Sequence, residues 1–276
     1  MMEQEKDRQL GITFQISLDS FLDEPKIVND EKSTQYEQAL QVLEEAKRFR
    51  SNQKKCDIAK QALGICGDCI EAYLVYGWNV QDIYERIHIL RQGMELATMN
   101  IGKEFFLRHV TDFYEEDVMK PLLQIKFAYA LSLYEAGNLK KAQKQFQEIL
   151  NLNPSDVFHV KHYVYASYLY FEQLEKCKEL LGRELHEDTF LMYVRFLLLM
   201  KEEQINEAKA MVTQLAQANT HLFDMLTYRM MNTAAIVPHF EAGSFEEAAY
   251  IYKVLSKVIS TLEYLPVFLM KYENED

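Results

Sequence analysis

The segment that most constrains the fold of this chain is residues 131–154, LSLYEAGNLKKAQKQFQEILNLNP. Apolar residues at helical spacing stop at Gly137-Asn138, and a second helical stripe begins at once and ends at Asn153-Pro154. This pattern predicts two antiparallel helices joined by a tight turn. A helix pair this short cannot bury its apolar face alone, so it must stack on similar neighbours.

Similar pairs recur further along the chain and can be placed in register by one small residue. It is expected where the second helix of a pair crosses the first, because the two backbones come closest there. In every pair an apolar residue lies three positions before it and another four positions after it. The small residues are Ala142, Cys177, Ala208 and Ala248, at spacings of 35, 31 and 40 residues.

The turn inside each pair lies five residues before the small residue. Gly137 and Gly243 stand there in two of the pairs, and glycine suits the left-handed backbone that ends a helix. Glu172 and Glu203 stand there in the other two pairs. We therefore expect these two glutamates to adopt a left-handed conformation at some cost in strain.

Residues 123–156 resemble the tetratricopeptide repeat family. The residues at its signature positions are Ala130, Gly137, Leu139, Ala142, Phe146, Leu150 and Pro154. The resemblance implies an all-α superhelix of about six or seven helical hairpins, stacked in a right-handed arc over residues 33–272. Residues 1–32 are expected to form a partly ordered arm and residues 273–276 an acidic tail.

A narrower resemblance covers about half of the chain. The segments GKEFF (102–106), DFY (112–114), LNPSD (152–156) and AKQAL (59–63) look like those of tetratricopeptide proteins related to suppression of tumorigenicity 7. Lys120-Pro121 and Gly137-Asn138 fit the same group, whereas Val118-Met119 and His162 depart from it. The resemblance implies a helical interaction scaffold and little more.

Composition narrows the classes of partner. The formal net charge is −12, which repels phosphate backbones and disfavours nucleic acid as a partner. The strongest apolar run, residues 190–200, is interrupted by Arg195 and is too short to span a bilayer. The first residues are charged and do not resemble a secretory signal, so we expect a cytoplasmic protein whose four cysteines are reduced.

The resemblance also implies that the first helix of each pair lines a concave groove. We expect this groove to bind a protein or peptide, with aromatic and apolar residues supplying contact area and a few basic residues supplying direction. Its candidate residues are Gln124, Lys126, Phe127, Leu131, Tyr134, His159, Lys161, His162, Ala166, Leu169 and Arg195. A competing interpretation is that the lysine stems pack between helices while the amines reach water.

Two patterns raise the question of redox or metal chemistry. Cys66 and Cys69 have the spacing of a redox or metal pair, but Cys66 is expected at a helix C-terminus, where the dipole does not activate a thiol. His159 and His162 are predicted three positions apart on one helix, with Asp156 a turn earlier. Asp156 would be a weak third ligand for a metal, so the sequence predicts no metal site, no cofactor and no catalytic residue.

The sequence therefore favours a non-enzymatic scaffold that binds a protein or peptide. One alternative is a peptide-sensing regulator that changes curvature on binding, and a less favoured one is a metal-dependent enzyme. Pro238 is expected to kink a helix. The last helix, from Phe245 to about Met270 with a break near Pro266, is expected to cap the stack or else to offer a surface for a homodimer.

Overall fold

The computed structural model describes residues 30–106, 111–229 and 240–273. These residues form helices and connecting turns, with no strand among them, which confirms the all-α class. The chain divides into two compact units with a boundary between Val160 and Lys161. We call the described residues before this boundary the N-terminal unit and those after it the C-terminal unit.

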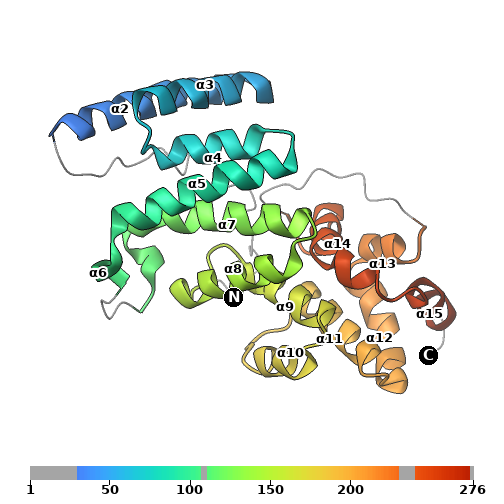
Figure 1. The fold of residues 1–276 in the computed structure, drawn as a ribbon. Helices are drawn as coiled ribbons and strands as arrows, with labels where there is room; N and C mark the ends of the chain where they lie inside the picture. Colours follow the sequence, from blue (N-terminus) through green and yellow to red (C-terminus); the bar gives the residue numbers. More distant parts are fainter. Residues whose placement is uncertain (1–29, 107–110, 230–239, 274–276) are drawn as a thin grey trace, which may run out of the picture. The chain divides into compact units, whose positions relative to one another are not determined.

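The N-terminal unit is built from helices that pack in chain order (Figure 1). Each of α3, α4 and α5 packs against the helix before it, α7 packs against α5 and α4, and α8 packs against α7. The short elements α6, η2 and η3 separate α5 from α7. The bounds are α2 (Asp30–Glu44), η1 (Glu45–Arg48), α3 (Asn52–Ile65), α4 (Ile70–Asn79), α5 (Ile83–Ile101), α6 (Lys103–Phe106), η2 (Phe113–Glu115), η3 (Asp117–Met119), α7 (Lys120–Glu135) and α8 (Leu139–Leu152).

The C-terminal unit continues the alternation of first and second helices. Helix α11 packs against α12, α13 packs against α14, and α15 packs against α12 and α13. The bounds are α9 (Val160–Tyr170), α10 (Leu174–Leu181), α11 (Thr189–Lys201), α12 (Ile205–Ala218), α13 (Thr220–Leu226), α14 (Phe245–Ile259) and α15 (Leu265–Tyr272). The superhelical arc expected over residues 33–272 stays a prediction.

The predicted left-handed turns are confirmed. Gly137 and Gly243 have φ of 79° and 78°, and Glu172 and Glu203 have φ of 54° and 58°. The residue after each of Gly137, Glu172 and Glu203 donates its N–H to the carbonyl five positions earlier, at 2.8, 2.8 and 2.9 Å. These bonds satisfy carbonyls at the end of the first helix and turn the chain directly into the second.

The register of small residues is confirmed as well. Ala142, Cys177, Ala208 and Ala248 each have no exposed surface. Each donates its N–H to the carbonyl of the residue that caps its helix, at 3.0 to 3.1 Å. All four therefore occupy the same position in the first turn of the second helix, where a larger side chain would push the paired helix away.

A buried carboxyl joins α2 to α4 in the N-terminal unit. Glu71 is 5% exposed and accepts hydrogen bonds from the Tyr36 hydroxyl and, at 3.7 Å, from the Cys69 thiol. Burial raises the pKa of Glu71 above its usual value, and the two donated hydrogen bonds only partly oppose that rise. Tyr36 lies on α2 and Glu71 on α4, so this contact fixes α2 against the next pair.

The insertion between α5 and α7 is held by a second polar cluster. The Asp112 carboxylate accepts hydrogen bonds from the Asn153 side chain at 3.0 and 3.1 Å and from the backbone N–H groups of Ser155 and Tyr114, both at 2.9 Å. Burial tends to raise the pKa of Asp112, but the bonds from Ser155 and Asn153 outweigh it and lower the pKa. Asp112 thus ties the insertion to the turn after α8.

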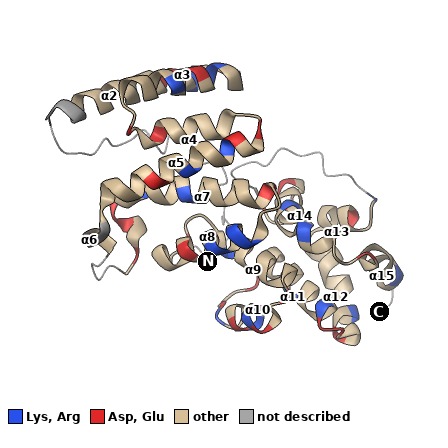
Figure 2. Ribbon diagram, in the orientation of Figure 1, with Lys and Arg blue, Asp and Glu red and all other residues tan. Residues whose placement is uncertain are grey.

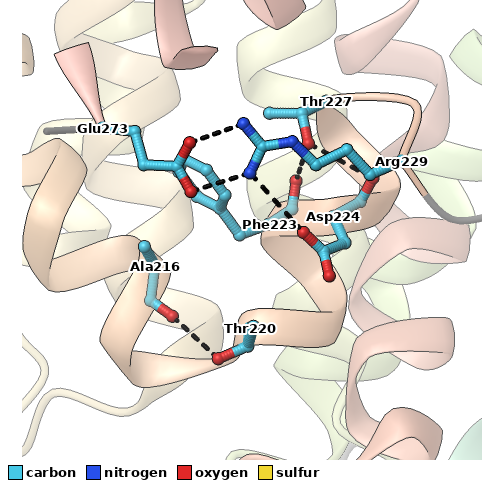
Figure 3. A network of polar contacts seen from close by, with 7 residues as sticks. All are labelled: Ala216, Thr220, Phe223, Asp224, Thr227, Arg229 and Glu273. Atoms are coloured by element: carbon cyan, nitrogen blue, oxygen red, sulfur yellow. Dashed lines mark hydrogen bonds and ion pairs between the residues drawn. The ribbon is translucent and has the colours of Figure 1, made fainter.

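The C-terminal helix breaks near Pro266, as predicted, and the break lies just before that residue. Helix α14 ends at Ile259, and Pro266 lies in the first turn of α15, where proline is tolerated because the N–H it lacks would have no helical partner. Arg229 then fastens the end of α15 by donating to both Glu273 oxygens, at 2.7 and 2.5 Å, beside Asp224 (Figure 3). Glu273, expected in the acidic tail, is therefore held against the end of α13.

Several predictions lie outside the described residues. They are the order of residues 1–29, the kink at Pro238 and the tail residues 274–276. Residues 30–32, expected in the N-terminal arm, belong to α2. None of the described helices is both long and apolar enough to span a membrane.

Candidate functional site

The candidate groove residues of α7 lie mostly in the core of the N-terminal unit. Gln124, Phe127 and Tyr134 are 6%, 3% and 5% exposed, whereas Leu131 is half-buried. The Phe127 ring stacks on Phe158 at a centroid distance of 5.3 Å. Ten of the sixteen residues of α7 are buried, because α4, α5 and α8 all pack against this helix. A partner cannot reach the buried three without opening the helix packing.

Four further candidates lie on α9 or directly before it, and one prediction about them is wrong. His159 is not on the same helix as His162: the helix begins at Val160, and His159 has a left-handed backbone with φ of 51°. The His159 ring is half-buried, which lowers its pKa. His162 is 7% exposed, stacks on Phe190 at 3.8 Å between centroids and shares a 2.7 Å hydrogen bond with the Tyr250 hydroxyl. Ala166 and Leu169 have no exposed surface.

The three basic candidates each face a glutamate. The Lys126 ammonium lies 2.6 Å from Glu148 in the N-terminal unit. In the C-terminal unit the Lys161 ammonium lies 3.3 Å from Glu184, and the Arg195 guanidinium lies 2.8 Å from Glu187. Each lysine ammonium group is therefore paired with a carboxylate, and the two lysines do not form an uncompensated basic patch. Arg195 remains 52% exposed.

The structure brings Arg195 to a pocket between the end of α10 and the start of α11, which we call the α10–α11 pocket. Its volume is about 200 Å³. Figure 2 shows acidic and basic positions interleaved along α10 and the loop after it. The lining residues are Leu181, Glu184, Leu185, His186, Glu187, Leu191 and Arg195.

The walls of this pocket combine apolar and charged groups. Leu191 is buried and Leu181 half-buried, but Leu185 is 90% exposed at the rim. Asp188 caps α11 by accepting the N–H of Leu191 at 2.8 Å, which fixes where the loop ends. Glu184 is fixed by the Tyr165 hydroxyl, which donates to it at 3.1 Å. The arrangement can receive one apolar side chain beside a charged rim.

The sequence did not single out Leu185, Glu184 or Glu187. The available signal was one leucine inside the polar loop GRELHEDT, residues 182–189, because an apolar residue in such a loop has no helical face on which to pack. The exposure of the Leu185 side chain could be known only from the three-dimensional structure of this loop.

The sulfur and histidine candidates form no ligand cluster in the described ranges. No group of three His, Cys, Asp or Glu side chains gathers there as a metal site would require. Cys66 caps the C-terminus of α3, as predicted, and Cys69 is the N-cap residue of α4. Burial and the neighbouring Glu71 raise the pKa of the Cys69 thiol, which disfavours the reactive thiolate.

Comparison with family models, with curated proteins and with solved structures gave no match to this chain. The tetratricopeptide resemblance therefore rests on the sequence pattern and on the repeated helix pairs alone.

Proposed function

We propose that this chain is a non-enzymatic scaffold that binds another polypeptide, and that the α10–α11 pocket is one of its contact points. The observation that carries the proposal is the 90% exposed Leu185 at the rim of a pocket walled by Leu181 and Leu191. Leaving a leucine in water forgoes about 1.5–3 kcal/mol of burial free energy. A partner that covers Leu185 would recover part of it.

The charged rim suits a polypeptide partner. Arg195 and Glu187 form an ion pair whose side chains are 52% and 43% exposed, so each can exchange this contact for one with a partner at small cost. A pocket of about 200 Å³ holds a single apolar side chain rather than a cofactor. Apolar anchors in pockets surrounded by polar groups are typical of protein–protein contacts.

This proposal keeps only some of the candidate groove residues as contact residues. Six of the eleven candidates are buried: Gln124, Phe127, Tyr134, His162, Ala166 and Leu169. We assign these six to the packing of the scaffold and keep Arg195 as a contact residue. Lys161 keeps a role because it pairs with Glu184, a residue of the pocket, whereas Lys126 pairs with Glu148, which does not line it.

The test is affinity capture from native cell extract with the full chain and two variants. The double variant Leu185→Ser/Arg195→Glu should lose a specific partner at least tenfold, since it removes the apolar anchor and reverses the rim charge. Arg183→Glu is the matched control, because Arg183 is 68% exposed in the same loop and pairs with Glu179. Equal capture by the double variant and the wild type would contradict the assignment of this pocket.

A further inference from the structure

The N-terminal unit contains a second concave site, between α3 and the turn from α4 to α5, which we call the α3–α5 cleft. Its volume is about 280 Å³. It is walled mainly by polar side chains and lacks the three leucines that line the α10–α11 pocket. Those that matter for its chemistry are Lys60, Tyr76, Asn79, Asp82 and Glu85.

Asn79 leaves a hydrogen-bond acceptor in the wall of this cleft. Its side chain is 9% exposed, and its Nδ2 donates to the carbonyl of Val75 at 2.7 Å. Its Oδ1 receives no hydrogen bond from the residues that the structure describes. The buried side-chain atoms without a hydrogen-bond partner do not include this Oδ1, so it reaches solvent in the cleft and can accept an N–H or O–H from a ligand in place of water.

The same wall carries two carboxylates. One Asp82 oxygen accepts the backbone N–H of Glu85 at 2.7 Å, and one Glu85 oxygen accepts the Tyr76 hydroxyl at 2.8 Å. Neither carboxylate has an ion pair within the described ranges, and each keeps a second oxygen for a ligand. An acceptor amide and two carboxylates together favour a cationic ligand with several N–H groups.

A cation of the protein itself already lies on the aromatic part of the cleft. The Lys60 ammonium is 4.9 Å from the centre of the Tyr76 ring. This contact is exposed, so the lysine can leave it for water at small cost. Its position shows that the ring and the neighbouring Glu85 attract a positive charge.

We propose that the α3–α5 cleft binds an arginine side chain of a partner polypeptide. The guanidinium replaces the Lys60 ammonium over the Tyr76 ring, donates to Glu85 and gives one N–H to Asn79 Oδ1. Arginine fits better than lysine because its planar fork can stack on a ring and bond a carboxylate in the same pose. The net charge of −12 favours a basic partner over long distances.

This proposal does not depend on the α10–α11 pocket, since every residue that it uses lies in the N-terminal unit. The test is a ligand-observed NMR titration of the full chain with acetyl-arginine-amide at constant ionic strength. Acetyl-citrulline-amide, which has nearly the same shape without the charge, serves as the control probe. We expect saturable arginine binding with a Kd on the order of 1 mM and none by citrulline.

Three variants make the titration specific. Glu85→Gln should weaken arginine binding about fivefold while preserving the helix start, since the Asp82 cap bonds the backbone N–H of residue 85 and not its side chain. Lys60→Ala should tighten binding about threefold, because it removes the internal competitor. Glu95→Gln removes an equal charge from an exposed site on the same helix and should change the Kd less than twofold.

The proposal is overturned by non-saturable binding or by equal binding of the citrulline probe. It is also overturned if the Kd for arginine is unchanged or higher in the Lys60→Ala variant. It is equally overturned if Glu95→Gln weakens binding as much as Glu85→Gln, because the effect would then be one of net charge alone. Thermal melting of each variant shows whether a lost signal reflects unfolding instead, and a lysine probe tests the preference for arginine.

Discussion

Replacing Glu203 with glycine is expected to stabilise the C-terminal unit, although it deletes a side chain. Glu203 follows α11 with φ of 58°, a conformation that side chains with a Cβ adopt only with strain. Its side chain is exposed and makes no hydrogen bond or ion pair with the described residues. The backbone bond from Gln204 to the Leu199 carbonyl, at 2.9 Å, does not involve the side chain and would remain.

The magnitude follows from two opposing terms. A left-handed conformation costs a non-glycine residue roughly 1–2 kcal/mol, which glycine would relieve. Glycine also makes the unfolded chain more flexible, which costs roughly 0.5–1 kcal/mol. The net expectation is a gain of about 0.5–1 kcal/mol in the free energy of unfolding.

Urea denaturation followed by circular dichroism measures this gain, and two further variants control for it. Gln214→Gly lies at an exposed position inside α12 and should destabilise by about 1 kcal/mol, because glycine disfavours a helix interior. Gly137→Ala should also destabilise by about 1 kcal/mol, since an added Cβ there meets open space and only the φ of 79° opposes it. If Glu203→Gly lowered stability as Gln214→Gly does, the proposed turn conformation would be refuted.

Three further outcomes are expected from polar contacts in the N-terminal unit. Lys126→Glu should destabilise by about 1 kcal/mol in urea denaturation, because it sets two carboxylates beside each other at Glu148, whereas Lys126→Met should cost less; equal costs would contradict the ion pair. Asp112→Ala should cost about 2–4 kcal/mol by leaving buried donors unpaired, and the contribution of Asp112, present above the ordinary pKa, should vanish as pH falls through its lowered pKa. Because the pKa of Glu71 is raised, its contribution to the free energy of unfolding is fully present below the unfolded-state pKa near 4.5 and is lost as pH rises through the folded-state pKa. Glu71→Gln should remove this decline in stability. Urea unfolding of both proteins at pH 4.5 and 7.5 would detect the difference.

The repeated hairpins were predictable because local sequence determines them. A left-handed turn, a capping residue and a small residue five positions after the turn lie within one short segment, and each has its own steric requirement. This reasoning located Glu172 and Glu203 correctly even though glutamate is an unusual residue for such a turn.

The exposed face of each first helix was not predictable in the same way. Helical periodicity identifies an apolar stripe but not how many neighbours cover the remaining surface. Gln124 and His162 are polar residues that the sequence placed on a solvent-facing lining, yet both are buried. His162 is accommodated there because Tyr250, 88 positions away in sequence, supplies a hydrogen bond. Asp112 depends similarly on Asn153, 41 positions away.

Both proposed sites lie where the chain departs from its own repeat. The turn between α4 and α5 has no left-handed residue and instead continues through extended backbone at Val80 to the Asp82 cap, which leaves room for the α3–α5 cleft. The connection from α10 to α11 runs from Gly182 to Asp188, whereas Asn219 alone joins α12 to α13. Repeated turns are constrained by packing, so residues there have little freedom to serve a ligand. Irregular connections are less constrained, and the exposed Leu185 and the solvent-accessible Oδ1 of Asn79 lie in or directly beside these two connections.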